Sequence, residues 1–193
     1  MSSFEKNIVL CGVGGQGTVL ASKVIAAAAM KKGYNVMSAE TIGMAQRGGS
    51  VFSHLRIGED IYSPMIGEHS ADLIFGFEPG ETVRMLPFLK EGGSVIVADR
   101  VVMPVTASLS ESNYNSEQMI DFLRSKVSNL SVVKTDEALK ELGSGKVLNV
   151  LMIGAAVSSG ALGMTAEEIF EVLKERLPEK VHDLNYRALT YYK

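Results

Sequence analysis

Residues 8–39 constrain the fold more strongly than any other part of this 193-residue chain. Residues 8–11 form a short apolar run that ends in glycines, which is typical of a buried parallel strand. Residues 18–32 carry an alanine-rich helix pattern, and residues 35–39 have the pattern of a second strand. A strand, a helix and a strand in this order form a βαβ unit, so we expect the chain to open an α/β fold.

The rest of the chain continues this alternation and then becomes helical. Further strands are expected at residues 50–57, 72–76, 94–98 and 132–133, with residues 61–63 pairing back on the first of them as a hairpin. A short helix is expected at 81–89, an exposed loop at 105–116, and later helices at 136–142, 146–159, 165–177 and 181–192. Thr165 and Glu168 have the spacing of a capping box. The sequence therefore predicts one α/β domain, residues 1–193, with a Rossmann-like, mostly parallel sheet flanked by helices and a helical C-terminal part.

The charge and the cysteine count argue against several classes of function. The net charge is −3, whereas a nucleic-acid surface needs a dominant basic face. Cys11 is the only cysteine, so the chain cannot by itself build an internal disulfide, a cysteine-ligated iron–sulfur cluster or a structural zinc site. Its apolar neighbours indicate a buried core residue. His54, His69 and His182 have no metal-ligand spacing, so no metal site and no catalytic residue is expected.

The N-terminal residues lead directly into the first strand pattern. They do not have the pattern of a signal peptide, and the chain has no apolar run long enough to span a membrane. We therefore expect a cytoplasmic protein with no membrane contact.

Residues 12–17 read Gly-Val-Gly-Gly-Gln-Gly and fit the G-x-G-x-x-G pattern after a strand and before a helix. Glycines there let a phosphate approach the free N–H groups of the helix N-terminus. Glu40 follows the second strand, near where an acid would bind a ribose hydroxyl. The competing interpretation is that the glycines only permit close packing of helix on strand. The candidate cofactor-binding residues of this loop are Gly12, Gly14, Gly15, Gln16 and Gly17.

Other enzyme signatures are missing from the sequence. Residues 41–50 are not typical of a dehydrogenase, and no lysine follows the glycines as a nucleotide triphosphatase would require. No G-x-S-x-G pattern occurs, so Ser50 and Ser53 have no nucleophile elbow. The glycine loop thus indicates a binding site without a catalytic centre beside it.

Four segments in a fixed order carry a resemblance to a known family. They are residues 12–17, the Arg-Gly-Gly-Ser of residues 47–50, the Ile-Tyr-Ser-Pro of residues 61–64, and residues 149–155 on a late helix. With them the chain resembles the gamma domain of the pyruvate and other 2-oxoacid:ferredoxin oxidoreductases. Among stand-alone chains it is similar to the beta subunit of the indolepyruvate type.

The resemblance implies a docking subunit. A larger partner chain would carry thiamine diphosphate, magnesium and iron–sulfur clusters, decarboxylate 2-oxo acids such as aryl pyruvates, and pass electrons to ferredoxin. The acyl group would go to coenzyme A, and this chain, inactive alone, would be structural or associated with coenzyme A. Arg47, Gly48, Gly49 and Ser50 join the candidate cofactor-binding residues, with Arg47 either holding an anion or shaping the loop. A permanently docked subunit should also expose an apolar patch that its partner covers.

Two other functions stay open on the residues alone. One is an independent enzyme that binds NAD(P) through Gly12, Gly14, Gly17 and Glu40. The other is a free-standing sensor of an adenine nucleotide.

Overall fold

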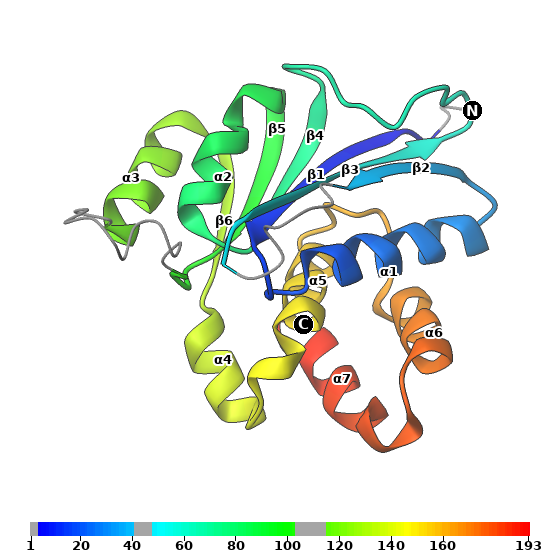
Figure 1. The fold of residues 1–193 in the computed structure, drawn as a ribbon. Helices are drawn as coiled ribbons and strands as arrows, with labels where there is room; N and C mark the ends of the chain where they lie inside the picture. Colours follow the sequence, from blue (N-terminus) through cyan, green and yellow to red (C-terminus); the bar gives the residue numbers. More distant parts are fainter. Residues whose placement is uncertain (1–3, 41–47, 103–114) are drawn as a thin grey trace.

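The computed structural model describes residues 4–40, 48–102 and 115–193. In this part of the chain a six-stranded sheet lies at the centre with helices on both faces (Figure 1). The strands are β1 (Lys6–Val13), β2 (Asn35–Glu40), β3 (Ser50–Gly58), β4 (Ala71–Gly76), β5 (Leu89–Ala98) and β6 (Asn129–Val133), in the spatial order β2-β3-β1-β4-β5-β6. The helices are α1 (Thr18–Lys31), α2 (Pro79–Met85), α3 (Ser116–Lys126), α4 (Thr135–Leu142), α5 (Leu148–Ser158), α6 (Ala166–Arg176) and α7 (His182–Leu189). The predicted α/β class, the six predicted core strands and the helical C-terminal part are confirmed.

One strand runs against the others. β1, β4, β5 and β6 pair in parallel, whereas β3 is antiparallel to both of its neighbours, β1 and β2. β1 and β2 therefore run in the same direction but do not touch, because β3 lies between them. The expected hairpin between residues 50–57 and 61–63 is wrong, since both edges of β3 are already paired and residues 59–70 contain no strand.

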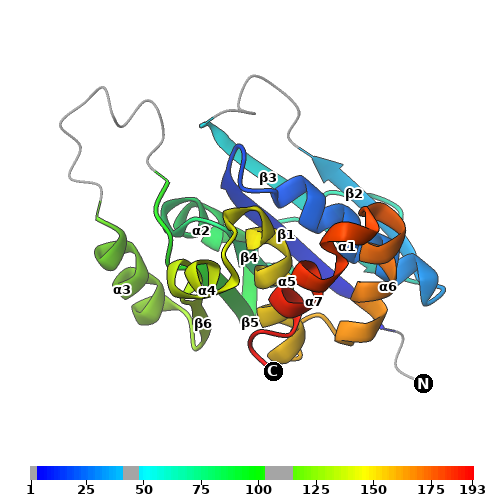
Figure 2. The ribbon, with the colours of Figure 1, turned by 90° about the horizontal axis from the view of Figure 1, so that it is seen from below.

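One face of the sheet is covered by α1, α4, α5, α6 and α7, which Figure 2 shows on the near side of the strands. α5 is buried on nearly every side, as expected of a helix whose residues are apolar all round. The predicted capping box of α6 is confirmed. Glu168 N donates to Thr165 Oγ1 at 3.2 Å, and Thr165 N donates to Glu168 Oε2 at 2.9 Å.

The other face is covered by α2 and α3 (Figure 1). The expected helix at 81–89 is shorter, because α2 ends at Met85 and Leu89 already belongs to β5. The loop expected at 105–116 lies mostly outside the described residues, but α3 begins at Ser116. The sequence pattern does not predict α3, since only two of its side chains, Ile120 and Leu123, are buried.

Two buried side chains tie β1 and β3 to this second layer. Cys11 is fully buried, and burial raises the pKa of its thiol well above the usual range, as expected of an unreactive core residue. His54 is also buried, and its Nδ1 accepts a hydrogen bond from Ile66 N at 2.9 Å. Nε2 must then carry the proton, and burial lowers the pKa of the ring. Neutral His54 thus holds the segment after β3 against the sheet.

No helix in the described parts of the chain is both long and apolar enough to cross a bilayer.

Gly154→Ala should destabilise the protein. An added Cβ would lie 2.2 Å from Leu189 O, so α7 would have to move off α5. Ala gains about 1 kcal/mol of helix propensity over Gly, but overpacking against fixed backbone costs about 1–3 kcal/mol, so a net loss is expected. Urea unfolding measures this loss as a lower midpoint for the variant. Gly145→Ala is the control, since a Cβ there meets nothing within 4 Å. Equal midpoints for the two variants would contradict the close approach of α5 and α7.

Stability should fall as the pH drops below about 6.5. Because burial lowers the pKa of His54 in the folded state, the unfolded chain binds the proton first and gains from it. One such group gives a slope of at most about 1.4 kcal/mol per pH unit. In His54→Asn the Oδ1 can still accept from Ile66 N, but the variant should lose the part of the acid dependence of stability that His54 causes. Urea unfolding at several pH values compares the two proteins, and the same acid slope in both would rule His54 out as its source.

Candidate functional site

The glycine loop joins the carboxyl end of β1 to the N-terminus of α1. Gly17 is the N-cap of α1 with φ 85°, a left-handed conformation that favours glycine, and no side chain caps the helix. The first intrahelical bond runs from Ala21 N to Gly17 O at 2.9 Å. The N–H groups of the first turn therefore lack a capping side chain, which is the arrangement that receives an anion.

Gln16 fixes the shape of this loop from beneath. Its Oε1 accepts from Val13 N at 2.7 Å, and its Nε2 donates to Phe77 O at 2.8 Å. The side chain is buried, so both halves of the amide serve backbone groups at the ends of β1 and β4. A role of Gln16 in cofactor binding stays a prediction, to which this structural role is added.

Gly12 has a packing role. A Cβ added there would lie 2.9 Å from Phe77 Cβ and 2.7 Å from Gln16 Oε1. The close-packing interpretation therefore fits Gly12, whereas Gly15 is exposed with open space around it and φ 102°. The loop therefore combines packed glycines with Gly15, which faces solvent.

The second segment of candidate residues, 47–50, lies against the glycine loop through Gly48 and Gly49. Gly14 N donates to Gly49 O at 2.8 Å, and Gly48 N donates to Gly14 O at 3.4 Å. Ser50 turns toward α2, where its Oγ donates to the buried carboxylate of Glu81 at 2.5 Å. Arg47 lies outside the described residues, so its proposed contact with an anion stays a prediction.

A cavity of about 440 Å³ opens beside the loop. Three of its polar side chains were not predicted as site residues from the sequence: Arg100 after β5, Lys146 in the turn before α5, and Asn149 in the first turn of α5. The two cations add to the positive end of α1 and favour an anionic ligand. The full lining is Gly14, Gly15, Gln16, Gly17, Leu20, Arg100, Val102, Gly145, Lys146, Leu148 and Asn149.

Signals for two of these residues are present in the sequence. The carboxyl ends of parallel strands meet at one edge of a sheet, and Arg100 is the second residue after β5. Asn149 begins the late helix segment that carries the family resemblance. Lys146 gives no such signal, because its position depends on how the helical layer packs against α1.

Glu40 does not join this site. β3 separates β2 from β1, so the end of β2 lies two strand spacings, roughly 10 Å, from the glycine loop. Glu40 is also absent from the cavity lining. A dinucleotide fold places its ribose-binding acid on the strand beside the first one, so this geometry disfavours the NAD(P) interpretation.

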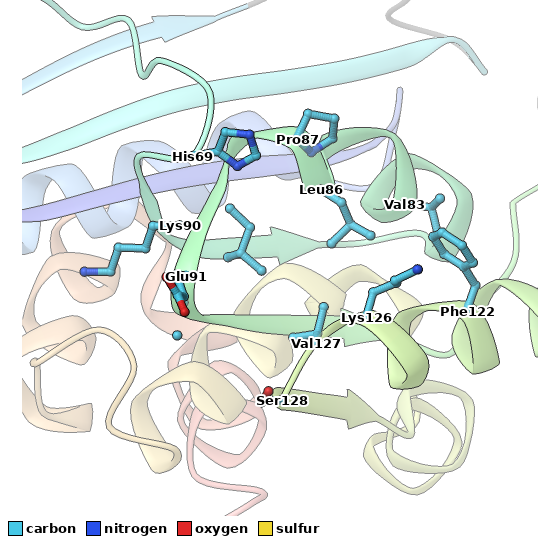
Figure 3. A pocket seen from close by; sticks show the side chains of 13 residues that line it. His69, Val83, Leu86, Pro87, Lys90, Glu91, Phe122, Lys126, Val127 and Ser128 are labelled. Carbon is cyan, nitrogen blue, oxygen red and sulfur yellow. The ribbon is translucent and has the colours of Figure 1, made fainter.

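A second, larger cavity of about 670 Å³ lies between α2, α3 and the start of β5. Figure 3 shows Leu86 and Val127 pointing into it, with Phe122 and Lys126 from α3 along one side. It lies at the amino ends of the strands, opposite to the edge where open α/β sheets bind ligands. Its apolar floor and its rim of lysines fit a contact surface better than a ligand pocket.

No group of three or more potential metal ligands (His, Cys, Asp or Glu) occurs within the described ranges.

Comparison with known proteins gives a consistent result. Residues 7–191 match the family model described as pyruvate ferredoxin/flavodoxin oxidoreductase. A Pyrococcus horikoshii protein named indolepyruvate oxidoreductase subunit IorB is 37% identical over 95% of this chain and 92% of its own length. The Archaeoglobus fulgidus protein of the same name is 38% identical over 95% of this chain and 91% of its own.

Solved structures agree with the fold. The pyruvate oxidoreductase subunit PORC of Thermotoga maritima has a TM-score of 0.70 and 25% identity, with 97% of this chain and 94% of that chain covered. A 2-oxoglutarate:ferredoxin oxidoreductase of Magnetococcus marinus, described with 2-oxoglutarate, coenzyme A and succinyl-CoA bound, has a TM-score of 0.71. At 18% identity it shows the fold alone, and this chain covers 30% of that longer chain. There, a domain of this fold is part of a larger polypeptide.

Gln16→Ala should lower stability by at least about 2 kcal/mol, because it leaves the buried Val13 N–H and Phe77 C=O without partners. Thermal and urea unfolding measure the loss. Gln118→Ala is the matched control, since that glutamine is exposed on α3 and its truncation should change stability by less than about 0.5 kcal/mol. If Gln16→Ala unfolds like the control, the amide does not fix the loop.

Proposed function

Because the chain belongs to the pyruvate ferredoxin/flavodoxin oxidoreductase family, we propose that it is the small, non-catalytic subunit of an indolepyruvate-type 2-oxoacid:ferredoxin oxidoreductase. The observation that carries the proposal is the 37% identity to a protein named indolepyruvate oxidoreductase subunit, over 95% of this chain and 92% of that one. The complex would convert 2-oxo acids, aryl pyruvates among them, to acyl-coenzyme A and pass the electrons to ferredoxin.

The redox centres belong to the partner in this proposal. Iron–sulfur clusters are held by several cysteine thiolates, and this chain has only Cys11, which is fully buried in β1. Its residues therefore do not fit a cluster, and the sequence has no Gly-Asp-Gly motif for thiamine diphosphate and its magnesium. The larger subunit would hold these groups and perform the decarboxylation and the electron transfer.

The cavity beside the glycine loop is our candidate site for a phosphate-bearing part of coenzyme A. Three features support this: the uncapped N-terminus of α1 and the cations Arg100 and Lys146. Arg100 makes one long ion pair with Asp136, 3.8 Å between Nε and Oδ1, on the surface. Such a pair stabilises little, so Arg100 is available to a ligand. No residue in this arrangement would act on the substrate itself.

The groove of Figure 3 is the surface that we assign to the larger subunit. Phe122 is 43% exposed there, beside half-buried Leu86 and Leu89, and Lys126 Nζ lies 5.8 Å from the centre of the Phe122 ring. An aromatic anchor in an apolar groove with a charged rim is typical of interface hot spots. The position at the amino ends of the strands leaves the glycine-loop edge open for the cofactor.

Co-expression with the larger subunit tests the function. The isolated chain should be colourless and inactive, and the complex should reduce a one-electron dye when given indolepyruvate and coenzyme A. Phe122→Glu should reduce the complex recovered by affinity purification at least tenfold, since a buried charge in an interface costs more than about 1.4 kcal/mol. Activity per recovered complex should stay near the original.

Met30→Glu is the control for this variant, because Met30 is 63% exposed at the far end of α1. It should not change recovery. An active isolated chain that oxidises NADH would overturn the proposed function. Equal recovery of Phe122→Glu and Met30→Glu complexes would rule out the groove as the docking surface but would leave the proposed function standing.

A further inference from the structure

The connection between β3 and β4, residues 59–70, carries a motif that the proposed function does not use. Residues 61–64 read Ile-Tyr-Ser-Pro and belong to the family resemblance, yet they line neither of the cavities described above. Because β3 is antiparallel to β1 and β4 is parallel to it, the end of β3 and the start of β4 lie at the amino edge of the parallel strands. Figure 1 shows the connection, which we call the 59–70 loop, following this edge of the sheet.

The 59–70 loop is fixed to the sheet at three points. Ile66 is buried in the core cluster of the α2 and α3 face. Arg56 Nη1 donates to Ser63 O at 3.1 Å, and Asn7 Nδ2 donates to Ser70 O at 3.1 Å. The loop has no strand or helix of its own, so these contacts with β1 and β3 hold its shape. A surface fixed in this way loses little conformational freedom when a partner binds.

The outer side of the 59–70 loop is apolar. Tyr62 is 86% exposed and Met65 is 58% exposed. Met37 of β2 is exposed as well and lies directly opposite Arg56 in the β2–β3 ladder, so it projects from the same face of the sheet. α2 and α3 pack mainly on β1, β4, β5 and β6, which leaves the β2–β3 part of this face to the loop. Large apolar side chains gathered on one exposed face are typical of a protein interaction surface.

Carboxylates flank this apolar surface. Glu59, Asp60 and Glu68 are exposed, and none of them forms an ion pair in the described part of the chain. Arg56, the cation beneath the loop, is occupied by two hydrogen bonds within the chain. In a two-fold contact a second copy would bring the same carboxylates against this rim, and like charges across an interface are unfavourable. The complementary partner therefore carries Lys or Arg around an apolar centre.

The loop continues into the groove that we assign to the larger subunit. His69 and Pro87 both line that groove, and Figure 3 shows them beside each other. His69 N donates to Pro87 O and Ser70 N donates to Phe88 O, both at 2.9 Å. The groove and the loop thus lie on one face of the sheet at its amino edge. A partner that fills the groove is in position to cover the loop.

We propose that the 59–70 loop is a second docking site for the larger subunit, where Tyr62 and Met65 enter an apolar depression whose rim carries Lys or Arg for Glu59, Asp60 and Glu68. Tyr62 is the anchor, because a tyrosine on a fixed backbone buries a large area at a small cost in side-chain entropy. The identity of the partner rests on the proposed function, whereas the acidic rim and the exposed tyrosine do not.

Binding of the full chain to the immobilised larger subunit tests the anchor. Tyr62→Ala should weaken this binding at least about tenfold. Because the Tyr62 side chain is mostly exposed, the variant should unfold at nearly the same temperature as the unaltered chain, so the loss is one of contact and not of fold. Equal affinity of the two proteins would overturn the inference.

Met65→Ala and Met30→Ala form a matched pair. The two methionines are exposed to a similar extent, but Met30 is in α1 on the other face of the sheet. Met65→Ala should weaken binding at least about threefold, and Met30→Ala should leave it unchanged. The same effect from both variants would count against the loop as the contact.

Two triple variants test the acidic rim. The first is Glu59→Gln, Asp60→Asn and Glu68→Gln. The control changes exposed acids of the C-terminal helical layer and is Glu137→Gln, Glu179→Gln and Asp183→Asn. Only the first should slow association, by at least about threefold at low ionic strength, and make the association rate less sensitive to salt. An identical salt dependence of the two variants would contradict a basic partner surface at the loop.

Two further results separate the loop from the proposed function. Sedimentation of the chain alone should show no dimer that Tyr62→Ala abolishes, since such a dimer would place a second copy on the loop and overturn the inference. If the unaltered chain fails to bind a larger subunit, the proposed function falls and the partner of the loop falls with it. A complex that oxidises indolepyruvate and binds Tyr62→Ala with undiminished affinity would overturn the loop alone.

Discussion

The antiparallel strand β3 between β1 and β2 is the constraint on which the rest of the structure depends. It pairs with β1 over eight residue positions and with β2 over six, so it separates two strands that a simple βαβ unit would place side by side. The two residues before it meet the glycine loop, where Gly49 and Gly48 exchange backbone hydrogen bonds with Gly14. The same strand that covers one side of the loop moves Glu40 away from it. One topological feature thus leaves the candidate anion site at the glycine loop intact and moves away the acid that a nicotinamide dinucleotide would need.

The elements with strong local signals could be predicted from sequence. The apolar runs of β1, β4 and β5 and the capping box of α6 each depend on neighbouring residues alone, and all are found. The order of the strands could not be predicted, because residues 50–57 alternate in a way that fits either a hairpin or an inserted strand. α3 was not predicted because only two of its side chains are buried, so its apolar pattern in the sequence is weak.

Only the glycine-loop half of the candidate site could be predicted from the sequence. The glycine loop is continuous in sequence, so the motif indicates both its place and its chemistry. Arg100 follows β5, and Lys146 and Asn149 lie together at the start of α5, so the sheet edge brings the first to the loop and packing of the helical layer brings the other two. For Gln16 the motif predicts the position of the residue but not its role. Only the structure shows that its amide is hydrogen-bonded to Val13 N and Phe77 O. A position within a binding motif can therefore serve the shape of the loop.

α5 connects the fold to the site. Its first turn places Asn149 beside Gly17, while Gly154 in the same helix approaches Leu189 O so closely that no side chain fits between them. Both contacts depend on glycine, and they lie on different parts of one buried helix. Because α5 is packed on almost every side, both contacts constrain the same closely packed helix. The position of α7 and the position of Asn149 therefore both depend on how α5 packs, and α7 also contributes Leu184 and Asn185 to a cavity of about 210 Å³ between α1, α5, α6 and α7.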